Sequence, residues 1–243
     1  MSKVRFLSGN ALKMIAAIAM LIDHVGLLFF PGKDIFRIIG RLAFPIFAFM
    51  IAEGCRYTKN KLRHFLTLAA FALVIQLVYS IAMDSFLMSI FVTFSISVIL
   101  IYSLQYFKKC FFDRECGAPK KLLSALLFVG LMFGAFVLNL YLDIDYGFEG
   151  SMIPVFASVL HSDENSPPLL KKLDILPLNL VLFGIGLLYM AAIGRPINYY
   201  TLISIPLLLL YSGKRGTKRL KYFFYIFYPL HLVVLYGLTL IIK

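Results

Sequence analysis

Long uncharged runs constrain the fold of this 243-residue sequence more than any other feature. Residues 122–142 and 175–193, for example, contain no Asp, Glu, Lys or Arg. About 20 apolar residues in a helix cross the hydrocarbon core of a bilayer, where only helices and closed barrels satisfy every backbone hydrogen bond. The runs are continuous rather than alternating, which favours helices. Because 61% of the residues are hydrophobic, more than a soluble core of this size can bury, we predict an all-α polytopic membrane helix bundle.

Turn-forming and basic stretches divide the chain into about nine predicted transmembrane helices. No stretch is left over for a soluble domain, so residues 1–243 are interpreted as a single integral-membrane domain. Within residues 150–175, a short apolar run precedes the turn-rich sequence HSDENSPPLLKK, and a re-entrant hairpin there would reverse the topology of everything that follows. The predicted helices cover approximately residues 11–30, 35–55, 65–83, 86–107, 121–142, 150–162, 175–193, 197–212 and 221–242.

Positive charge is concentrated between the apolar runs. The chain has 24 Lys and Arg residues against 12 Asp and Glu, a formal net charge of +12. Most of the bases lie at the N-terminus, as Lys3 and Arg5, and in RYTKNKLR, KKCFFDRECGAPKK, LLKKLD and GKRGTKRLK. Nine spans put all these segments on one side of the membrane, which the positive-inside rule makes cytoplasmic. Asp84 and Asp143 both fall in loops on the other side. The charge therefore indicates membrane topology with a cytoplasmic N-terminus, and not nucleic-acid binding.

The opening sequence MSKVRFLSGNALKMIAAIAML has the basic and apolar regions of a signal peptide. We expect no cleavage, because cleavage would sever Asp23 and His24 from their helix. The rest of the chain is polytopic in any case, so this segment is interpreted as the first membrane helix.

The three cysteines, Cys55, Cys110 and Cys116, all lie in or beside basic segments that are predicted to be cytoplasmic. A reducing compartment favours free thiols over disulfides. Two loop cysteines without a nearby pair of histidines make a poor metal site. We therefore expect reduced thiols and no bound metal.

Ionisable side chains inside the predicted helices are the first candidates for function. A charged group at membrane depth is costly unless it is paired or faces water, so its presence there points to a role. Lys13 and His24 are eleven residues apart, which on a helix is three turns plus about 20°, or about 16 Å along one face. Asp23 is rotated by about 100° from His24 and is expected to contact a neighbouring helix instead. A histidine buried only for packing would also account for His24.

The second predicted helix, DIFRIIGRLAFPIFAFMIAEGCRYTK, carries further charged groups. Arg37 and Arg41 share a face near its outer end. Pro45 is expected to kink the middle of the helix, and Glu53 closes its cytoplasmic end.

Antiparallel packing of the first two helices would bring their charges together in two layers. Arg41 would lie at the depth of Asp23, and Glu53 at the depth of Lys13. Two stacked ion pairs, Asp23 with Arg41 and Lys13 with Glu53, would then neutralise the helical hairpin. These pairs are compatible with a purely structural role and equally with a catalytic one.

Two more stretches place polar groups beside a turn or a proline that interrupts helical hydrogen bonding. In DIDYGFEG, Gly147 permits a tight turn before a short helix, and Asp145 is placed to cap that helix or to orient another residue. In YFFYIFYPLHLVV, Pro229 frees the carbonyl of Tyr225, and His231 follows two residues later. The alternative to a functional histidine is a simple proline kink in which His231 forms a hydrogen bond to a neighbouring group.

The stretches LIDHVG, GRLAFPIFAFMIAEGCR, DYGFEG and FYPLHL, in this order, resemble the TraX family, whose named member acetylates the N-terminus of conjugative F pilin. The resemblance extends over essentially the whole chain and is most specific in its first 60 residues. The family is in turn distantly similar to larger integral-membrane acyltransferases, which carry an Arg, ten residues and a His on a membrane helix. Lys13, ten residues and His24 match that spacing, with Lys in place of Arg.

The resemblance implies an acyltransferase that moves an acetyl group from cytoplasmic acetyl-CoA to an acceptor amine or hydroxyl at the outer face. A thioester donor needs a base for the acceptor's proton and a donor for the developing oxyanion. His24 is expected to be the general base, with a transient acetyl-histidine as a variant. Asp23 or Asp145 would orient it, Arg41 would bind an acceptor carboxylate or the oxyanion, and His231 would share the site.

The same resemblance implies the partners and the compartment. Coenzyme A is polyanionic, and the residues expected to bind it are Lys13, Glu53, Arg56 and Tyr228. The acceptor would be a pilin-like peptide or a cell-envelope glycan, and nothing in the residues separates an amine from a hydroxyl. The protein would be a multi-pass protein of the bacterial cytoplasmic (inner) membrane, in contact with the lipid bilayer.

Two other functional classes fit the same residues. In a proton-coupled transporter, Asp23, His24, Arg41 and His231 would form a relay through the bundle without any thioester. In a scaffold protein, the ion pairs would only hold helices together. A scaffold would tolerate His24→Asn, because Asn retains much of the hydrogen bonding but cannot act as a base.

Overall fold

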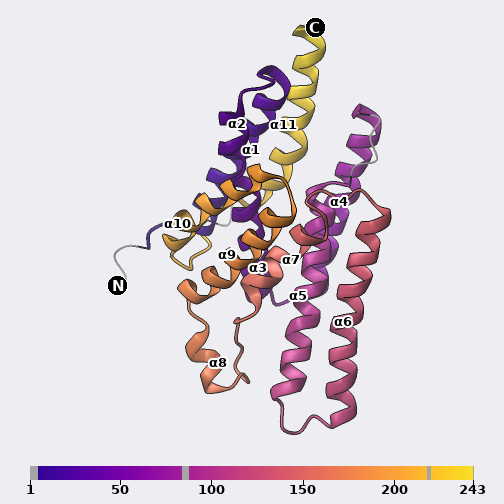
Figure 1. Ribbon diagram of the computed structural model, residues 1–243, viewed down its shortest axis with the longest axis vertical. Coiled ribbons are helices and arrows are strands. Elements are labelled where there is room, and N and C mark those ends of the chain that lie inside the picture. Colours follow the sequence, from indigo (N-terminus) through magenta and orange to yellow (C-terminus); the bar gives the residue numbers. More distant parts are fainter. Residues whose placement is uncertain (1–4, 84–87, 218–219, 243) are drawn as a thin grey trace. The chain divides into compact units, whose positions relative to one another are not determined.

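The computed structural model describes residues 5–83, 88–217 and 220–242, and Lys3 and Asp84 lie outside these ranges (Figure 1). Within the described ranges there is no strand, only isolated bridges that pair Leu7 with Tyr211 and Met88 with Ile144. The predicted all-α fold is confirmed. Its elements are α1 (Gly9–Phe29), α2 (Asp34–Gly40), α3 (Ala43–Tyr57), α4 (Lys61–Met83), α5 (Ile90–Phe112), α6 (Ala118–Tyr141), α7 (Gly147–Ser158), α8 (Pro168–Leu173), α9 (Leu176–Ile193), the 3-10 helix η2 (Pro196–Ile203), α10 (Ser204–Leu209) and α11 (Leu220–Ile242).

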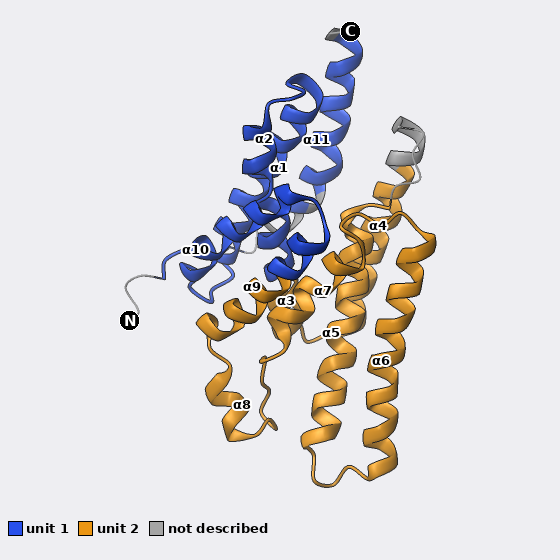
Figure 2. Ribbon diagram, viewed as in Figure 1, with its two compact units in different colours: residues 1–50, 187–243 blue, residues 51–186 orange. Residues whose placement is uncertain are grey.

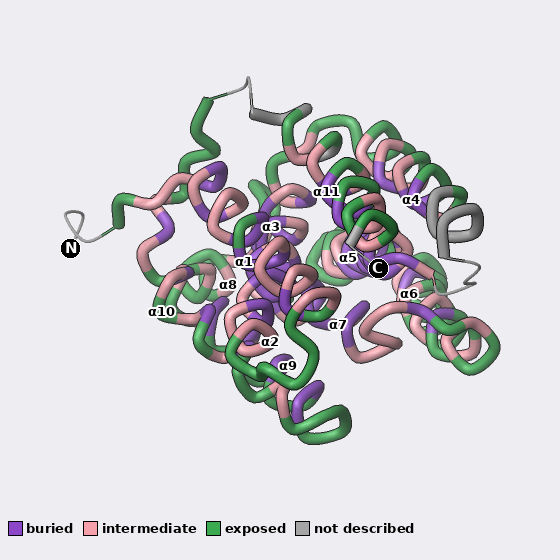
Figure 3. The backbone as a smooth tube through the Cα atoms, turned by 90° about the horizontal axis from the view of Figure 1, so that it is seen from above, coloured by how far each residue is buried: buried purple, intermediate pink, exposed green. Residues whose placement is uncertain are grey.

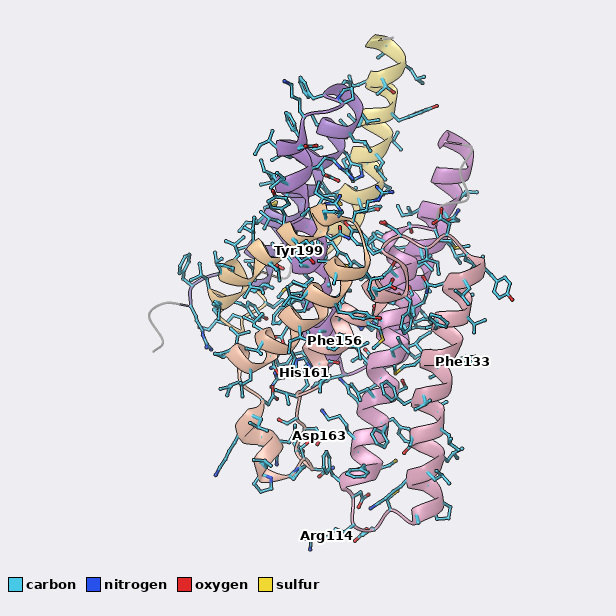
Figure 4. All side chains as sticks on the ribbon, in the orientation of Figure 1. Arg114, Phe133, Phe156, His161, Asp163 and Tyr199 are labelled. Atoms are coloured by element: carbon cyan, nitrogen blue, oxygen red, sulfur yellow. The ribbon has the colours of Figure 1, made fainter. Side chains whose placement is uncertain are left out.

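Several helices are long and apolar enough to cross a bilayer. Among the described residues there are five such segments: α1, α2 with α3, α5, α6 and α9. In α6 only 11% of the 18-residue apolar stretch is buried, against 61% of the corresponding stretch in α5. Figure 3 colours α6 largely pink and green. Phe133, which is labelled on α6 in Figure 4, is 67% exposed. An apolar helix with such a surface fits a multi-pass membrane protein, whereas the predicted count of nine spans stays a prediction.

The helices form two compact units, which Figure 2 shows in blue and orange. Unit 1 comprises residues 1–50 and 187–243, and in it α1 packs against α2 and α11. Unit 2 comprises residues 51–186, and in it α5 packs against α4, α6 and α7. The interpretation of residues 1–243 as one functional domain stays a prediction.

The predicted second helix is interrupted one turn before the expected kink. α2 ends at Gly40 and α3 begins at Ala43, so the break lies at Arg41 and Leu42 rather than at Pro45. Proline has no backbone N–H and therefore cannot bond to the carbonyl four residues earlier, which here belongs to Arg41. Pro45 thus sits in the first turn of α3, where its missing donor is tolerated.

Two other predicted helices differ from expectation in their length or form. The segment predicted at 150–162 is α7, a helix of 12 residues that ends at Ser158 and is tied to α5 by a hydrogen bond of 2.8 Å from the Ser97 hydroxyl to the Ser151 carbonyl. The segment predicted at 197–212 is η2 followed by the six-residue α10. Pro206 lacks the N–H that a continuous α-helix would use to bond to the Leu202 carbonyl, which accounts for the division.

Candidate functional site

His24 is placed by the first long helix of unit 1. Ser8 caps α1, since its side chain accepts a hydrogen bond of 3.1 Å from the backbone N–H of Ala11. The helix then continues without interruption to Phe29. His24 is half-buried in its last two turns, and its Nδ1 atom lies 2.9 Å from the carbonyl oxygen of Met20, one turn earlier.

His231 comes from α11 and meets His24 directly. Its Nε2 atom lies 3.3 Å from Nδ1 of His24, and the ring centroids are 5.0 Å apart at an interplanar angle of 61°. Its own Nδ1 atom lies 2.9 Å from the carbonyl oxygen of Phe227. The structure therefore brings together two histidines that the sequence analysis assigned to one site although 207 positions separate them.

The hydrogen-bond partners determine which nitrogens carry protons. A carbonyl oxygen only accepts, so Met20 and Phe227 place a proton on Nδ1 of each neutral ring. Nε2 of His231 then presents a lone pair to the Nδ1–H of His24, which is shared between that nitrogen and the Met20 carbonyl. Nε2 of His24 is left unprotonated, and no hydrogen bond to it is found within residues 5–83, 88–217 and 220–242. This is the tautomer that a general base requires.

Asp23 points to the neighbouring helix, as its rotation from His24 predicted. Its Oδ2 atom lies 2.8 Å from Nη1 of Arg37 and 3.9 Å from Nη2 of Arg41. The predicted partner Arg41 is therefore present, but Arg37 is the closer one. Nη1 of Arg41 also contacts Oδ1 of Asn198 at 3.4 Å. Two guanidinium groups against one carboxylate leave an excess of positive charge beside His24.

Small residues let α1 and α2 approach closely enough for these contacts. A Cβ atom built on Gly40 would overlap the Asp23 side chain, and one built on Gly26 would overlap Phe36. Close backbone approach at small residues is a common way of packing membrane helices. The two glycines therefore place the arginines of the α2 region against Asp23.

Lys13 and Tyr228, both expected to bind coenzyme A, lie in the same unit as the histidines. Nζ of Lys13 is 6.0 Å from the ring centroid of Phe224 on α11. The Tyr228 ring is buried and meets the His231 ring edge to face, with centroids 5.5 Å apart. Tyr228 thus contacts the histidine pair, while the pairing of Lys13 with Glu53 stays a prediction because Glu53 belongs to unit 2.

Asp145 is held in unit 2 by its backbone. Its N–H donates to the carbonyl of Met88 at 2.9 Å, and its carbonyl accepts from the Thr93 hydroxyl. Tyr146 and Gly147 have φ values of 62° and 65°, so the predicted tight turn is present and uses the left-handed region at both positions. The N-cap residue of α7 is Tyr146 and not Asp145, which leaves orientation of another residue as the predicted role of Asp145.

Glu53 lies beside a histidine that the sequence analysis did not select. Nε2 of His161 is 3.6 Å from Oε1 of Glu53, and the His161 side chain is only 3% exposed. His161 is labelled in Figure 4 on the segment that follows α7. Nζ of Lys108 donates hydrogen bonds of 2.7 Å to the carbonyls of both Val159 and His161, which holds this segment against α5.

Arg56 forms a two-point ion pair with Asp174. Its Nη1 and Nη2 atoms lie 3.1 and 2.8 Å from the two carboxylate oxygens. Asp174 also accepts from the backbone N–H and the hydroxyl of Ser162, at 2.8 and 2.9 Å, and from the Asn179 amide at 3.0 Å. This network ties the C-terminal end of α3 to the segments on both sides of α8. A role of Arg56 in binding coenzyme A stays a prediction.

Comparison with known proteins identifies the family. Residues 8–239, nearly the whole chain, match the family described as TraX protein. The chain belongs to the TraX family. The TraX chain is 26% identical to the probable fimbrial assembly protein FimC, serogroup H1, of Dichelobacter nodosus, over 94% of each sequence. It is 38% identical over 78 residues to the uncharacterized protein RP591 of Rickettsia prowazekii, an alignment covering 32% of this chain and 29% of that protein. No solved structure matches the chain.

The histidine pair gives this TraX chain the groups needed for acid–base chemistry. Nε2 of His24 can take up a proton, and the excess positive charge of Arg37 and Arg41 can stabilise a nearby anion. Cys55 and its two fellow cysteines are free. Within the described part of the chain, no group of three or more His, Cys, Asp or Glu side chains is arranged to hold a metal ion.

Sequence reasoning missed Asn198, His161, Lys108 and Asp174. Asn198 lies in GRPINYY and contacts Arg41 only because η2 folds back against α2. His161 and Asp174 border the turn-rich stretch whose topology was left open. One usable signal was present: the chain has 4 histidines, and His161 lies near the end of the helix predicted at 150–162.

Proposed function

We propose that this TraX-family protein is a membrane-embedded acetyltransferase that moves an acetyl group from acetyl-CoA to a nucleophilic acceptor. The contact between His24 and His231 carries the proposal. It fixes His24 in the tautomer with a proton on Nδ1 and leaves Nε2 for a substrate proton. A half-buried histidine in contact with a buried second histidine is an arrangement typical of a general base supported by a second residue.

In the proposed reaction the acceptor nitrogen or oxygen attacks the thioester carbonyl carbon as Nε2 of His24 removes its proton. The tetrahedral intermediate then collapses, the carbon–sulfur bond breaks, and the acetyl group remains on the acceptor. The proton passes from His24 to the departing thiolate, which leaves as the thiol of coenzyme A. No net redox change occurs.

The charged residues near His24 have supporting roles in this proposal. Arg41, the more buried guanidinium, stabilises the oxyanion or binds an acceptor carboxylate, and Arg37 neutralises Asp23. Asp23 keeps the two arginines in place, and orientation of His24 by Asp145 stays a proposal. These roles rest on the contacts of unit 1 for the first three residues and on the family for Asp145.

The residues that the resemblance assigns to coenzyme A stay proposals, each within its own unit. Lys13 and Tyr228 belong to unit 1, where Tyr228 is supported by its contact with His231. Glu53 and Arg56 belong to unit 2. The protein would lie in the bacterial inner membrane with its N-terminus in the cytoplasm, where acetyl-CoA is available. The basic segments between the apolar runs support this orientation.

The acceptor is proposed to be the N-terminal amine of a pilin-like peptide. The name of the Dichelobacter nodosus relative, a probable fimbrial assembly protein, supports a peptide over a cell-envelope glycan. The test uses purified protein in nanodiscs with acetyl-CoA and a synthetic pilin-like peptide, followed by mass spectrometry. The matched control is the same peptide with a blocked N-terminus. Acetylation of both peptides, or of a glycan extract alone, would contradict the amine assignment.

A proton relay is the second candidate function, and the same histidine contact favours it. His24 and His231 lie within hydrogen-bonding distance, and Asp23 is adjacent in sequence. The proton-relay hypothesis predicts proton flux across the membrane of vesicles that contain the protein but no acetyl-CoA. The acetyltransferase proposal predicts no such flux and requires the thioester.

A further inference from the structure

A basic glycine loop lies against the first turn of α1. The backbone N–H groups of Gly9 and Asn10 donate to the carbonyls of Lys214 and Arg215, at 2.8 and 2.9 Å. The Asn10 amide donates to the carbonyl of Thr217 at 2.6 Å. All these residues belong to unit 1, so the loop at 213–217 and the start of α1 form one surface.

Glycines give this loop its shape. Gly213 and Gly216 have φ values of 74° and 88°, which L side chains rarely adopt. A Cβ atom on Gly216 would also meet the Ser8 hydroxyl oxygen at 3.0 Å. The loop therefore turns tightly around Lys214 and Arg215 and leaves both exposed at the surface.

The loop concentrates positive charge, and few carboxylates are available within its own unit to balance that charge. Lys13 lies one turn after Gly9 on the same helix face, and the charges of Lys13 and Arg215 act on each other. In the sequence of unit 1 the acidic residues are Asp23 and Asp34 only. Asp23 is ten residues beyond Lys13, about 15 Å along the helix, and it already pairs with Arg37.

Like charges that lie close together repel one another, and an anion bound between them relieves that repulsion. The positive end of the α1 dipole adds to the same field. The first N–H groups of α1 are already bonded to loop carbonyls, so an anion there would be held by side chains. Lysine and arginine side chains recognise phosphate groups most strongly.

We infer that Lys13, Lys214 and Arg215 form a binding site for a phosphate-ester anion at the start of α1. The identification of that anion as coenzyme A rests on the proposed function, and the anion site itself does not. The phosphate group of an anionic lipid headgroup has the same chemistry and is the other source. If the anion is coenzyme A, the loop at 213–217 joins the residues that are proposed to bind acetyl-CoA.

Equilibrium binding of coenzyme A to the full chain in phosphatidylcholine nanodiscs tests the site without any catalytic turnover. We expect Arg215→Gln to weaken binding about tenfold, and Lys214→Gln with Arg215→Gln about a hundredfold, as charge-assisted phosphate contacts are lost. Pantetheine, which has no phosphate, should bind weakly and equally to all variants. Lys33→Gln removes an exposed base from the α1–α2 turn and should leave binding unchanged.

Lipid competition separates the two sources of phosphate. In one outcome, the protein in phosphatidylglycerol nanodiscs binds less of this lipid in Arg215→Gln than in the unmodified chain, while the affinity for coenzyme A is the same in every variant. That result would support the anion site and identify its ligand as a lipid headgroup. If neither ligand responds to Arg215→Gln or Lys13→Gln in correctly folded protein, the inference is wrong. Binding of coenzyme A that depends on the loop, without acetyl transfer, would keep the site and reject the proposed function.

Discussion

Nε2 of His231 lies 3.3 Å from Nδ1 of His24, on two helices that come from opposite ends of the chain. Because His231 donates through its own Nδ1 to the Phe227 carbonyl, it can only accept from His24 in the neutral state. His231 is therefore a positioning residue. It orients the ring of His24 and supports the proton on Nδ1, while Nε2 of His24 remains for substrate.

Substitution of His231 should separate positioning from catalysis. His231→Gln retains an amide oxygen able to accept from His24 and should keep kcat within about threefold. His231→Leu removes the acceptor and should lower kcat at least about tenfold with little change in KM, since only the alignment of the base is lost. Steady-state kinetics checks both variants. Equal losses in the two would contradict a hydrogen-bonding role for His231.

Removal of the Asp23 charge should destabilise unit 1. Asp23→Asn leaves Arg37 and Arg41 without their carboxylate, and we expect a loss of about 2 to 3 kcal/mol, less than for a fully buried pair because 29% of the Arg37 side chain is exposed. The double variant Asp23→Asn with Arg37→Gln should recover part of that loss. Thermal unfolding in detergent measures each. An unchanged midpoint in Asp23→Asn would show that the ion pair contributes nothing.

Gly40→Ala tests the close approach of α1 and α2. The added methyl group would overlap the Asp23 side chain, so we expect a loss of about 1 to 3 kcal/mol together with reduced activity. Gly130 lies in α6 with no heavy atom within 4 Å of a built Cβ. Gly130→Ala should therefore be neutral or slightly stabilising, by up to about 1 kcal/mol. Similar thermal midpoints for the two variants would argue against the tight contact.

The Asp174 carboxylate should make stability fall in acid. Burial alone raises the pKa of Asp174, but hydrogen bonds from Asn179 and Ser162 and the charge of Arg56 outweigh burial and hold the pKa below its ordinary value. A carboxyl group of this kind stabilises the fold fully above its unfolded pKa of about 4 and loses that contribution as pH falls through the lower folded pKa. The midpoint temperature of thermal unfolding should therefore fall when the pH is lowered below about 4.

The control for this acid effect is Asp163, an exposed carboxylate outside the pair with Arg56. Asp174→Asn should lower stability at neutral pH and flatten the decline in acid. Asp163→Asn should change neither. A decline of equal steepness in Asp174→Asn and in the unmodified protein would place the acid-sensitive group elsewhere.

The sequence was sufficient to predict the class of fold and the direction of Asp23. Uncharged runs as long as a bilayer is thick allow little besides membrane helices, and the 100° step between neighbouring helix positions separates Asp23 from His24. The positions of breaks were harder to predict. Pro45 acts on the carbonyl one turn earlier, so the helix is interrupted at Arg41 and not at the proline.

Partners that depend on folding back of the chain were not predictable. Arg37 and Arg41 lie on one helix face, so the sequence does not indicate which of them is closer to Asp23, and in the structure it is Arg37. The pairing of His161 with Glu53 joins α3 to the segment after α7, across more than a hundred positions in which no periodic pattern links the two residues. Long-range polar contacts leave no such pattern in a single sequence.

The most direct test of the proposed acetyltransferase is release of free thiol from acetyl-CoA by purified protein in nanodiscs with an acceptor peptide. We predict steady release by the unmodified protein, a decrease of at least about a hundredfold in His24→Asn, and normal release in His64→Asn, a histidine of unit 2 that bonds to Tyr102. Release that persists in His24→Asn, or that never occurs in the unmodified protein, would contradict the account.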